Sequence, residues 1–202
     1  MRVYFLRHGE TDWNVLRRLQ GSIDTPLNQT GIEQAKRWRR YFDRLPLAGI
    51  YSSALDRALH TAHLATGRPA CIVEEFNERS FGEWQGLTWP ELESTVSELD
   101  VRWSDNEFCP PGGESRSDLF SRVQFALQQI TSHHRSDDEV LIVAHGASGH
   151  AILAILLGHP IDARGSLPTL TNASLTIVEV DSSSASLVAS VLCEELANSS
   201  RL

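Results

Sequence analysis

The feature that most constrains this sequence is the alternation of short apolar runs with segments whose apolar residues recur at helical spacing. Buried strands are predicted at 3–6, 47–52, 71–74 and 140–144. Helices are predicted at 30–42, 56–66, 115–132 and 147–157. Strands that alternate with helices indicate an α/β fold, in which a mostly parallel sheet is covered by helices on both faces.

The remaining segments complete this picture. Two further strands are expected at 174–180 and 186–192, joined by an Asp-Ser-Ser-Ser turn. Residues 76–113 show an irregular pattern that includes Trp84, Trp89 and Trp103, which is typical of an excursion over a cleft. We therefore predict a single domain over 1–202, with a cleft-covering insertion at about 76–113 and a frayed tail at 198–202.

Composition narrows the classes of partner. The chain of 202 residues carries 18 Lys and Arg against 26 Asp and Glu, a net charge of −8, which argues against nucleic acid or an anionic membrane as the main partner. The apolar runs are too short for a signal peptide or a membrane span. Cys71, Cys109 and Cys193 form no Cys-x-x-Cys pair, so we expect a reduced, cytoplasmic chain without a structural zinc site.

Charged and imidazole side chains follow four of the predicted strands, either directly or within a few residues. In a parallel sheet, ligands bind outside the carboxyl ends of the strands, so these side chains are expected to converge at one edge. The convergent residues are Arg7, His8, Arg57, Glu78 and His145.

This set of residue types suits phosphate chemistry. An arginine offers forked donors that match phosphate oxygens, and a neutral imidazole is a competent nucleophile at phosphorus. The arginines disfavour a proton on His8, which helps to keep that imidazole neutral. The helix that begins after His145 and Gly146 can add backbone donors for an anion, while Glu78 can supply a proton to a leaving oxygen.

Other interpretations of single residues remain open. His8 and His145 could bind a metal, but no third ligand has matching spacing and the arginines would repel a cation, so we expect no metal. Glu83 lies in the same irregular segment as Glu78 and competes with it for the role of acid. The tryptophans of that segment either cover the core or line the cleft.

Several motifs occur in a fixed order over about 1–181. They are Leu6-Arg7-His8-Gly9-Glu10-Thr11 with Trp13-Asn14, Gln20-Gly21, Asp24-Thr25-Pro26-Leu27, Thr30-Gly31, Ser52-Ser53-Ala54-Leu55-Asp56-Arg57-Ala58, Asn77-Glu78-Arg79-Ser80-Phe81-Gly82-Glu83-Trp84-Gln85-Gly86, Pro111-Gly112-Gly113-Glu114-Ser115 and Val143-Ala144-His145-Gly146. Arg-His-Gly alone is a weak signal, but the ordered set is highly specific. Together the motifs resemble the histidine phosphatase superfamily of phosphoglycerate-mutase-like proteins.

The resemblance implies a three-layer α/β/α sandwich and a reaction through a phosphohistidine at His8. Arg7, Arg57 and His145 would then hold the transferred phosphoryl group. Glu78 would act as the general acid and later activate water. The positions expected to bind substrate or phosphate are Asn14, Gln20, Gly21 and Gly146. No metal or organic cofactor is implied.

The modest insertion resembles the small phosphatase branch of the family, which includes α-ribazole phosphatases and broad-specificity phosphatases. We therefore predict a metal-independent phosphomonoester hydrolase for a small phosphorylated metabolite. Two alternatives are a cofactor-dependent phosphoglycerate mutase, which must exclude water from the phosphoenzyme, and a non-catalytic module that binds a phosphate ligand. The expected edge strand at 186–192 would also allow a homodimer.

Overall fold

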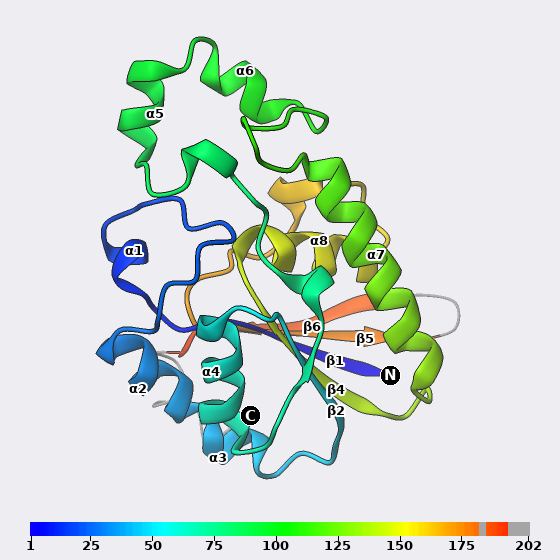
Figure 1. The fold of residues 1–202 in the computed structure, drawn as a ribbon. Coiled ribbons are helices and arrows are strands. Elements are labelled where there is room, and N and C mark those ends of the chain that lie inside the picture. The colour runs from blue at the N-terminus through cyan, green and yellow to red at the C-terminus, as the bar shows by residue number, and fades with distance from the viewer. Residues whose placement is uncertain (182–184, 194–202) are drawn as a thin grey trace.

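A six-stranded sheet forms the centre of the protein in the computed structural model, which describes residues 1–181 and 185–193 (Figure 1). The strands are β1 (Arg2–Arg7), β2 (Leu47–Ser52), β3 (Cys71–Ile72), β4 (Glu139–Ala144), β5 (Leu175–Val180) and β6 (Ala185–Val191). Their order across the sheet is β3-β2-β4-β1-β5-β6. The first four strands pair in parallel, whereas β5 runs antiparallel to both β1 and β6. The predicted mostly parallel sheet is confirmed.

Helices cover both faces of this sheet. The α-helices are α1 (Asp12–Val15), α2 (Gln29–Arg37), α3 (Arg39–Phe42), α4 (Asp56–Thr66), α5 (Trp89–Thr95), α6 (Leu99–Ser104), α7 (Arg116–His133) and α8 (Gly146–Leu156). The 3-10 helices are η1 (Glu74–Phe76), η2 (Gly82–Trp84) and η3 (Ala163–Ser166). Residues of α3 and α4, with Trp38 between α2 and α3, share one buried apolar cluster with the sheet, and residues of α7 and α8 share another. The predicted three-layer α/β/α arrangement is therefore confirmed.

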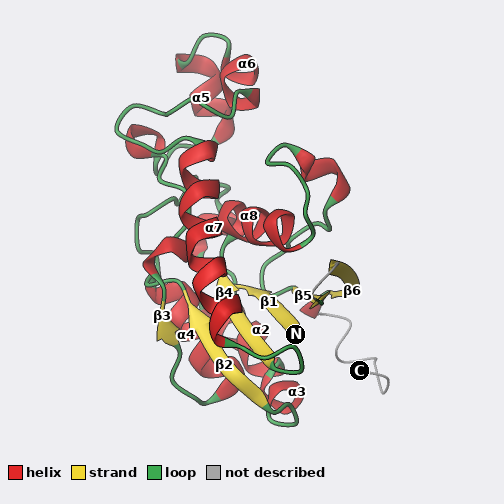
Figure 2. Ribbon diagram, turned by 90° about the vertical axis from the view of Figure 1, so that its right-hand side faces the viewer, coloured by secondary structure: helices red, strands yellow, loops and turns green. Residues whose placement is uncertain are grey.

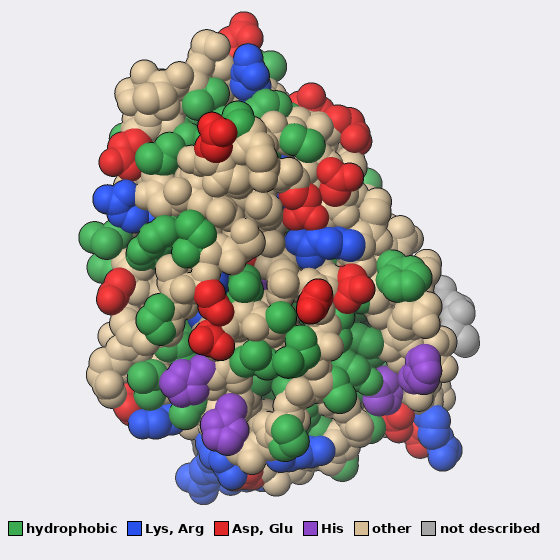
Figure 3. All heavy atoms as spheres, viewed as in Figure 1, with side chains coloured by type: hydrophobic (Ala, Val, Ile, Leu, Met, Phe, Trp, Pro, Cys, Tyr) green, Lys and Arg blue, Asp and Glu red, His purple; other side chains and the backbone are tan. Residues whose placement is uncertain are grey.

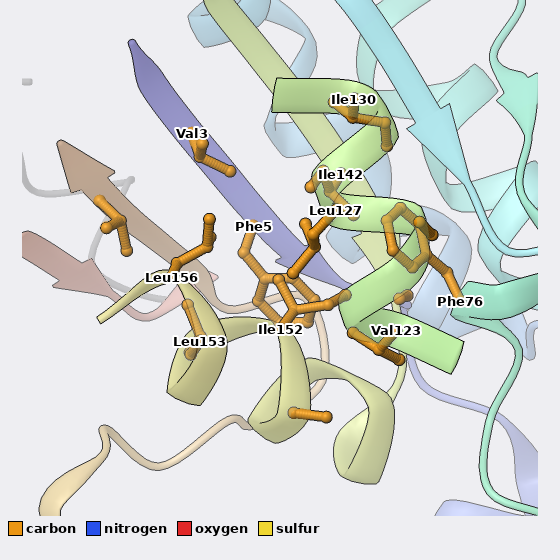
Figure 4. Packing of buried hydrophobic residues seen from close by; sticks show 14 of the residues in the cluster. Val3, Phe5, Phe76, Val123, Leu127, Ile130, Ile142, Ile152, Leu153 and Leu156 are labelled. Carbon is orange, nitrogen blue, oxygen red and sulfur yellow. The ribbon is translucent and has the colours of Figure 1, made fainter. Parts of the chain in front are cut away.

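Strand β1 shows why the sheet is buried on both faces. Val3 and Phe5 join the cluster beneath α7 and α8, whereas Tyr4 and Leu6 join the opposite cluster. Figure 4 shows Phe5 beside Ile152 of α8 in the first of these clusters. The alternating direction of side chains along a strand sends an unbroken apolar run into two cores at once.

Two predicted boundaries were wrong in detail. The single helix expected at 30–42 is divided at Trp38, a fully buried residue whose indole Nε1–H donates to the Ala173 carbonyl at 2.8 Å. The strand expected at 71–74 ends at Ile72, and a 3-10 turn begins at Glu74. This strand lies at the edge of the sheet with both residues exposed, so little apolar burial favours extending it.

Residues 76–113 are more regular than the sequence predicts. They contain η2, α5 and α6, and α5 and α6 project beyond the sheet layers in both ribbon views (Figures 1 and 2). This segment, here called the cap, has a small apolar core of its own that includes Trp84 and Leu92. Trp89 and Trp103 pack against that core, so these tryptophans hold the cap together.

The tail expected to fray, 198–202, lies outside the described residues. Among the described residues that Figure 3 draws on this face, acidic, basic and apolar side chains are intermixed and form no broad basic surface. None of the helices in the described ranges combines the length and apolar character needed to cross a membrane.

Candidate active site

The residues predicted to converge do meet at the carboxyl edge of the parallel strands. His8 directly follows β1 and His145 directly follows β4, and their ring centroids lie 5.1 Å apart. Arg57, on the first turn of α4, reaches His145 through its Nε. The structure therefore brings both histidines together beneath the start of α8.

The hydrogen bonding of His8 determines which ring nitrogen carries the lone pair. Its Nδ1 lies 2.7 Å from the Gly9 carbonyl oxygen, which can only accept, so Nδ1 carries the proton in the neutral ring. The lone pair is then on Nε2. Burial, followed by the charges of Arg7 and Arg57, holds the pKa of His8 well below its usual value of 6.5. His8 is thus a neutral imidazole at pH 7.

His145 is fixed in the opposite tautomer by a chain of hydrogen bonds. The Arg57 Nε–H donates to His145 Nδ1 at 3.2 Å, so the ring proton is on Nε2 and donates to Ser53 Oγ at 2.7 Å. Ser53 in turn donates to Asn77 Oδ1 at 2.8 Å. Burial, then Arg57, lowers the pKa of His145 well below 6.5 as well. Ser53 and Asn77 therefore orient an uncharged ring.

Glu78 lies across the N-terminus of α8. Its Oε2 accepts from the backbone N–H of Gly146 at 2.9 Å and of Ala147 at 3.0 Å, and its Oε1 accepts from Ser148 and Arg79. The first N–H groups of a helix have no partner within it, so they form a natural anion site. In this structure a carboxylate of the chain itself occupies that site.

Arg7 lies on the same side of the α8 N-terminus. A Cβ atom added to Gly146 would lie 3.5 Å from Glu78 Oε2 and 3.9 Å from Arg7 Cζ, so both groups lie within van der Waals contact of this position. One Nη of Arg7 donates to the Leu170 carbonyl, whereas its buried Nε has no hydrogen-bond partner in the described part of the chain. Burial lowers the pKa of Arg7. A buried guanidinium N–H is therefore left to meet an acceptor.

The loop of residues 20–23 supports Arg57. The Gly21 and Ile23 carbonyls accept from Arg57 Nη2 and Nη1 at 2.7 and 2.8 Å. Gln20 Oε1 accepts from Thr11 Oγ1 at 3.1 Å. The expected phosphate contacts of Gln20 and Gly21 stay a prediction, while their observed contacts hold the surrounding loop in place.

Asn14 has a partner that sequence reasoning missed. Asn172, just before β5, donates from Nδ2 to Asn14 Oδ1 at 3.1 Å and to the carbonyls of His8 and Gly9 at 3.2 and 3.3 Å. Asn172 precedes a strand, so a search limited to residues that follow strands does not find it. Because β5 is antiparallel, its amino end lies at the edge where the parallel strands end, and that direction was the available signal.

The sequence left two alternatives open, which are Glu83 as the acid and a metal bound by the histidines. Glu83 is exposed on the cap, where its backbone N–H donates to the Pro111 carbonyl. Over the residues that the structure describes, no group of three or more His, Cys, Asp and Glu side chains is arranged to hold a metal ion.

The buried neutral histidines predict how stability depends on pH. Unfolded histidines bind protons below about pH 6.5, whereas native His8 and His145 resist them. We expect the contribution of these two histidines to the free energy of unfolding to be fully present above pH 6.5. As the pH falls below 6.5, the free energy of unfolding should decrease by up to about 1.4 kcal/mol per pH unit for each histidine. Urea unfolding between pH 5 and 8 measures this slope.

The matched variants for that measurement are His8→Asn and His133→Asn. His8→Asn should reduce the slope below pH 6.5, because it removes a histidine that binds a proton in the unfolded chain but resists one in the native state. His133 is exposed at the end of α7, so its replacement should leave the slope unchanged. Equal slopes for His8→Asn and the parent protein would contradict the assignment of a depressed pKa to His8.

Comparison with known proteins identifies the family. A sequence model of the histidine phosphatase superfamily (branch 1) matches residues 3–191. A glucosyl-3-phosphoglycerate phosphatase of Mycolicibacterium vanbaalenii is 35% identical over 86% of this chain and 81% of its own length. A metal-independent phosphoserine phosphatase of Arabidopsis thaliana is 35% identical over 88% of this chain and 76% of its own.

The fold of a solved relative agrees with these matches. The crystal structure of the α-ribazole phosphatase from Shigella flexneri superposes with a TM-score of 0.83 and 28% identity, covering 93% of this chain and 95% of that one. The family predicted from the ordered motifs is thereby confirmed, and this chain belongs to the histidine phosphatase superfamily.

Proposed function

We propose that this protein hydrolyses phosphomonoesters of small metabolites through a phosphohistidine formed on His8 Nε2. The single observation that carries the proposal is the bond from His8 Nδ1–H to the Gly9 carbonyl, which leaves the lone pair on Nε2 of a buried neutral ring. Three relatives or structural neighbours with different names are phosphatases, which supports hydrolysis within a common scaffold.

In the first step, His8 Nε2 attacks phosphorus and the ester P–O bond breaks. Charge on the three equatorial oxygens of the transferring group is stabilised by cationic donors. Arg7 contributes its Nε–H and Arg57 contributes a guanidinium held rigidly by the Gly21 and Ile23 carbonyls. The phosphoryl group ends on His8. Glu78 takes up the proton of a monoanionic phosphate ester as its carboxylate leaves the α8 N–H groups, and it passes that proton to the leaving alkoxide.

Binding of the substrate sets the position of Glu78. The N–H groups of Gly146 and Ala147 that now donate to its carboxylate are equally good donors for a phosphate oxygen. An incoming phosphoryl group therefore competes for them and displaces Glu78 toward the leaving oxygen. The carboxyl group arrives beside the bond that breaks only when a substrate is bound.

In the second step, water replaces the departed alcohol. Glu78, now ionised, takes a proton from that water, whose oxygen attacks the phosphoryl group on His8. The P–N bond breaks, inorganic phosphate leaves and the neutral imidazole is restored. Asn14 shares the Asn172 Nδ2 donor with the His8 carbonyl, and it helps to orient the phosphoryl group in both steps.

The cysteines and the edge strand support a cytoplasmic location and a homodimer. Cys71 and Cys109 are exposed free thiols, which fits a reducing cytoplasm. Strand β6 ends the sheet and exposes Leu187 and Val188, so it is the surface on which a second copy would pair.

The proposed chemistry predicts turnover without metal. p-Nitrophenyl phosphate should be hydrolysed at the same rate with and without excess EDTA, because the nucleophile and the cationic donors are side chains. His8→Asn should reduce kcat by at least about 10³-fold, since no general base can substitute for a missing nucleophile. Activity that EDTA abolishes, or that survives His8→Asn, would count against the proposal.

A second prediction separates the two candidate acids. Glu78→Gln should lower kcat for an alkyl phosphate by about 10² to 10⁴-fold, because the poor leaving group loses its proton donor. The matched control, Glu83→Gln, lies on the cap surface and should retain near-normal kcat. Stopped-flow assays with p-nitrophenyl phosphate should still show a burst of nitrophenol for Glu78→Gln, followed by slow turnover. The reverse ranking of the two variants would transfer the role to Glu83.

A further inference from the structure

A pocket of about 240 Å³ lies beside Glu78, outside the set of groups used above. It is bounded by the cap, by the first turns of α7, by one face of α8 and by the chain around η3. Its lining residues are Arg79, Phe81, Trp103, Arg116, Leu119, Phe120, Ala147, His150, Ala151, Ala154, Ile161 and Leu167.

The pocket begins at the catalytic edge. Ala147 lines it and also donates its N–H to Glu78 Oε2, and Arg79 lines it and follows Glu78 in the chain. From Ala147 the lining positions on α8 continue through Ala151 to Ala154, which is one helix face spaced by three and four residues. The seven steps from Ala147 to Ala154 span roughly 10 Å along the helix axis. The lining therefore extends down the side of α8 from the residue that donates to Glu78.

Its walls are mainly apolar. Small alanine side chains on α8 leave the space, and Phe81, Trp103 and Phe120 close it from the other sides. The Arg79 guanidinium donates to the Glu114 and Phe108 carbonyls at 2.8 and 2.9 Å, and its Cζ lies 5.6 Å from the centroids of the Phe81 and Trp103 rings. Arg79 therefore serves as part of a wall around an apolar space.

We propose that this pocket receives an apolar portion of the leaving alcohol, so that the enzyme prefers phosphomonoesters of alcohols with an alkyl or aryl body. The proposal rests on the function proposed above, because Glu78 can protonate the leaving oxygen only while the rest of that alcohol extends past Glu78. Ala147 and Arg79 both line the pocket and donate backbone N–H groups to Glu78, so this apolar space lies beside the acid. Transfer of apolar surface from water into such a space strengthens binding in proportion to the area buried.

The test uses the n-alkyl phosphates from ethyl to octyl phosphate. Their leaving alcohols have nearly equal basicity, so differences in kcat/KM report binding of the chain. We expect kcat/KM to rise by up to about fourfold for each added methylene until the pocket is full and then to level off. A flat series, with ethyl phosphate turned over as well as the longer esters, overturns the inference and leaves the proposed function intact.

Two variants with opposite expected effects exclude a general loss of stability as the cause. Ala154→Leu places extra atoms in the far end of the pocket and should move the plateau to a shorter chain. Leu167→Ala enlarges the pocket and should move the plateau to a longer chain. The readout is the chain length at which each variant reaches its plateau, and thermal unfolding checks that each is folded.

The control for these variants is Phe125→Leu, because Phe125 is 58% exposed on α7 and does not line the pocket. It should leave the whole series unchanged. A plateau at the same chain length in both pocket variants and in the parent overturns the inference. Failure of the parent enzyme to hydrolyse any ester, p-nitrophenyl phosphate included, overturns the proposed function and this inference with it.

Discussion

The rest of the site depends on one hydrogen bond, from His8 Nδ1–H to the carbonyl of the next residue, Gly9. It directs the lone pair of a buried imidazole to Nε2. Burial makes a protonated ring costly and so lowers its pKa, and two guanidiniums nearby add to that cost. A weakly basic side chain is thus available as a nucleophile at neutral pH, next to the positive charge that a phosphoryl group needs.

The fold explains how two buried arginines can be held beside two neutral histidines. Backbone carbonyls of nearby loops accept hydrogen bonds from Arg57 and Arg7. The first N–H groups of α8 donate to the carboxylate of Glu78. Because β1 and β4 are parallel neighbours, His8 and His145 emerge side by side. Each cation is therefore oriented by rigid backbone, which spares the site from rearranging as charge develops in the transition state.

The sequence predicted this edge well, because the position of a residue directly after a buried strand follows from topology alone. His8 and His145 directly follow β1 and β4, and Arg57 and Glu78 come a few residues after β2 and β3. Asn172 was missed because it precedes an antiparallel strand, and the direction of β5 depends on pairing between distant segments. The short helices of the cap were missed because their apolar residues pack mainly on one another, so no long periodic pattern marks them.

The most direct test of the account is to trap the enzyme during turnover. Rapid quenching into alkali preserves phosphohistidine, and mass spectrometry of the peptides then locates the phosphoryl group. The account predicts one phosphoryl group on His8, bonded through Nε2, and its accumulation when Glu78 is replaced by Gln. A phosphoryl group on any other residue, or steady turnover with none on His8, would contradict the central claim.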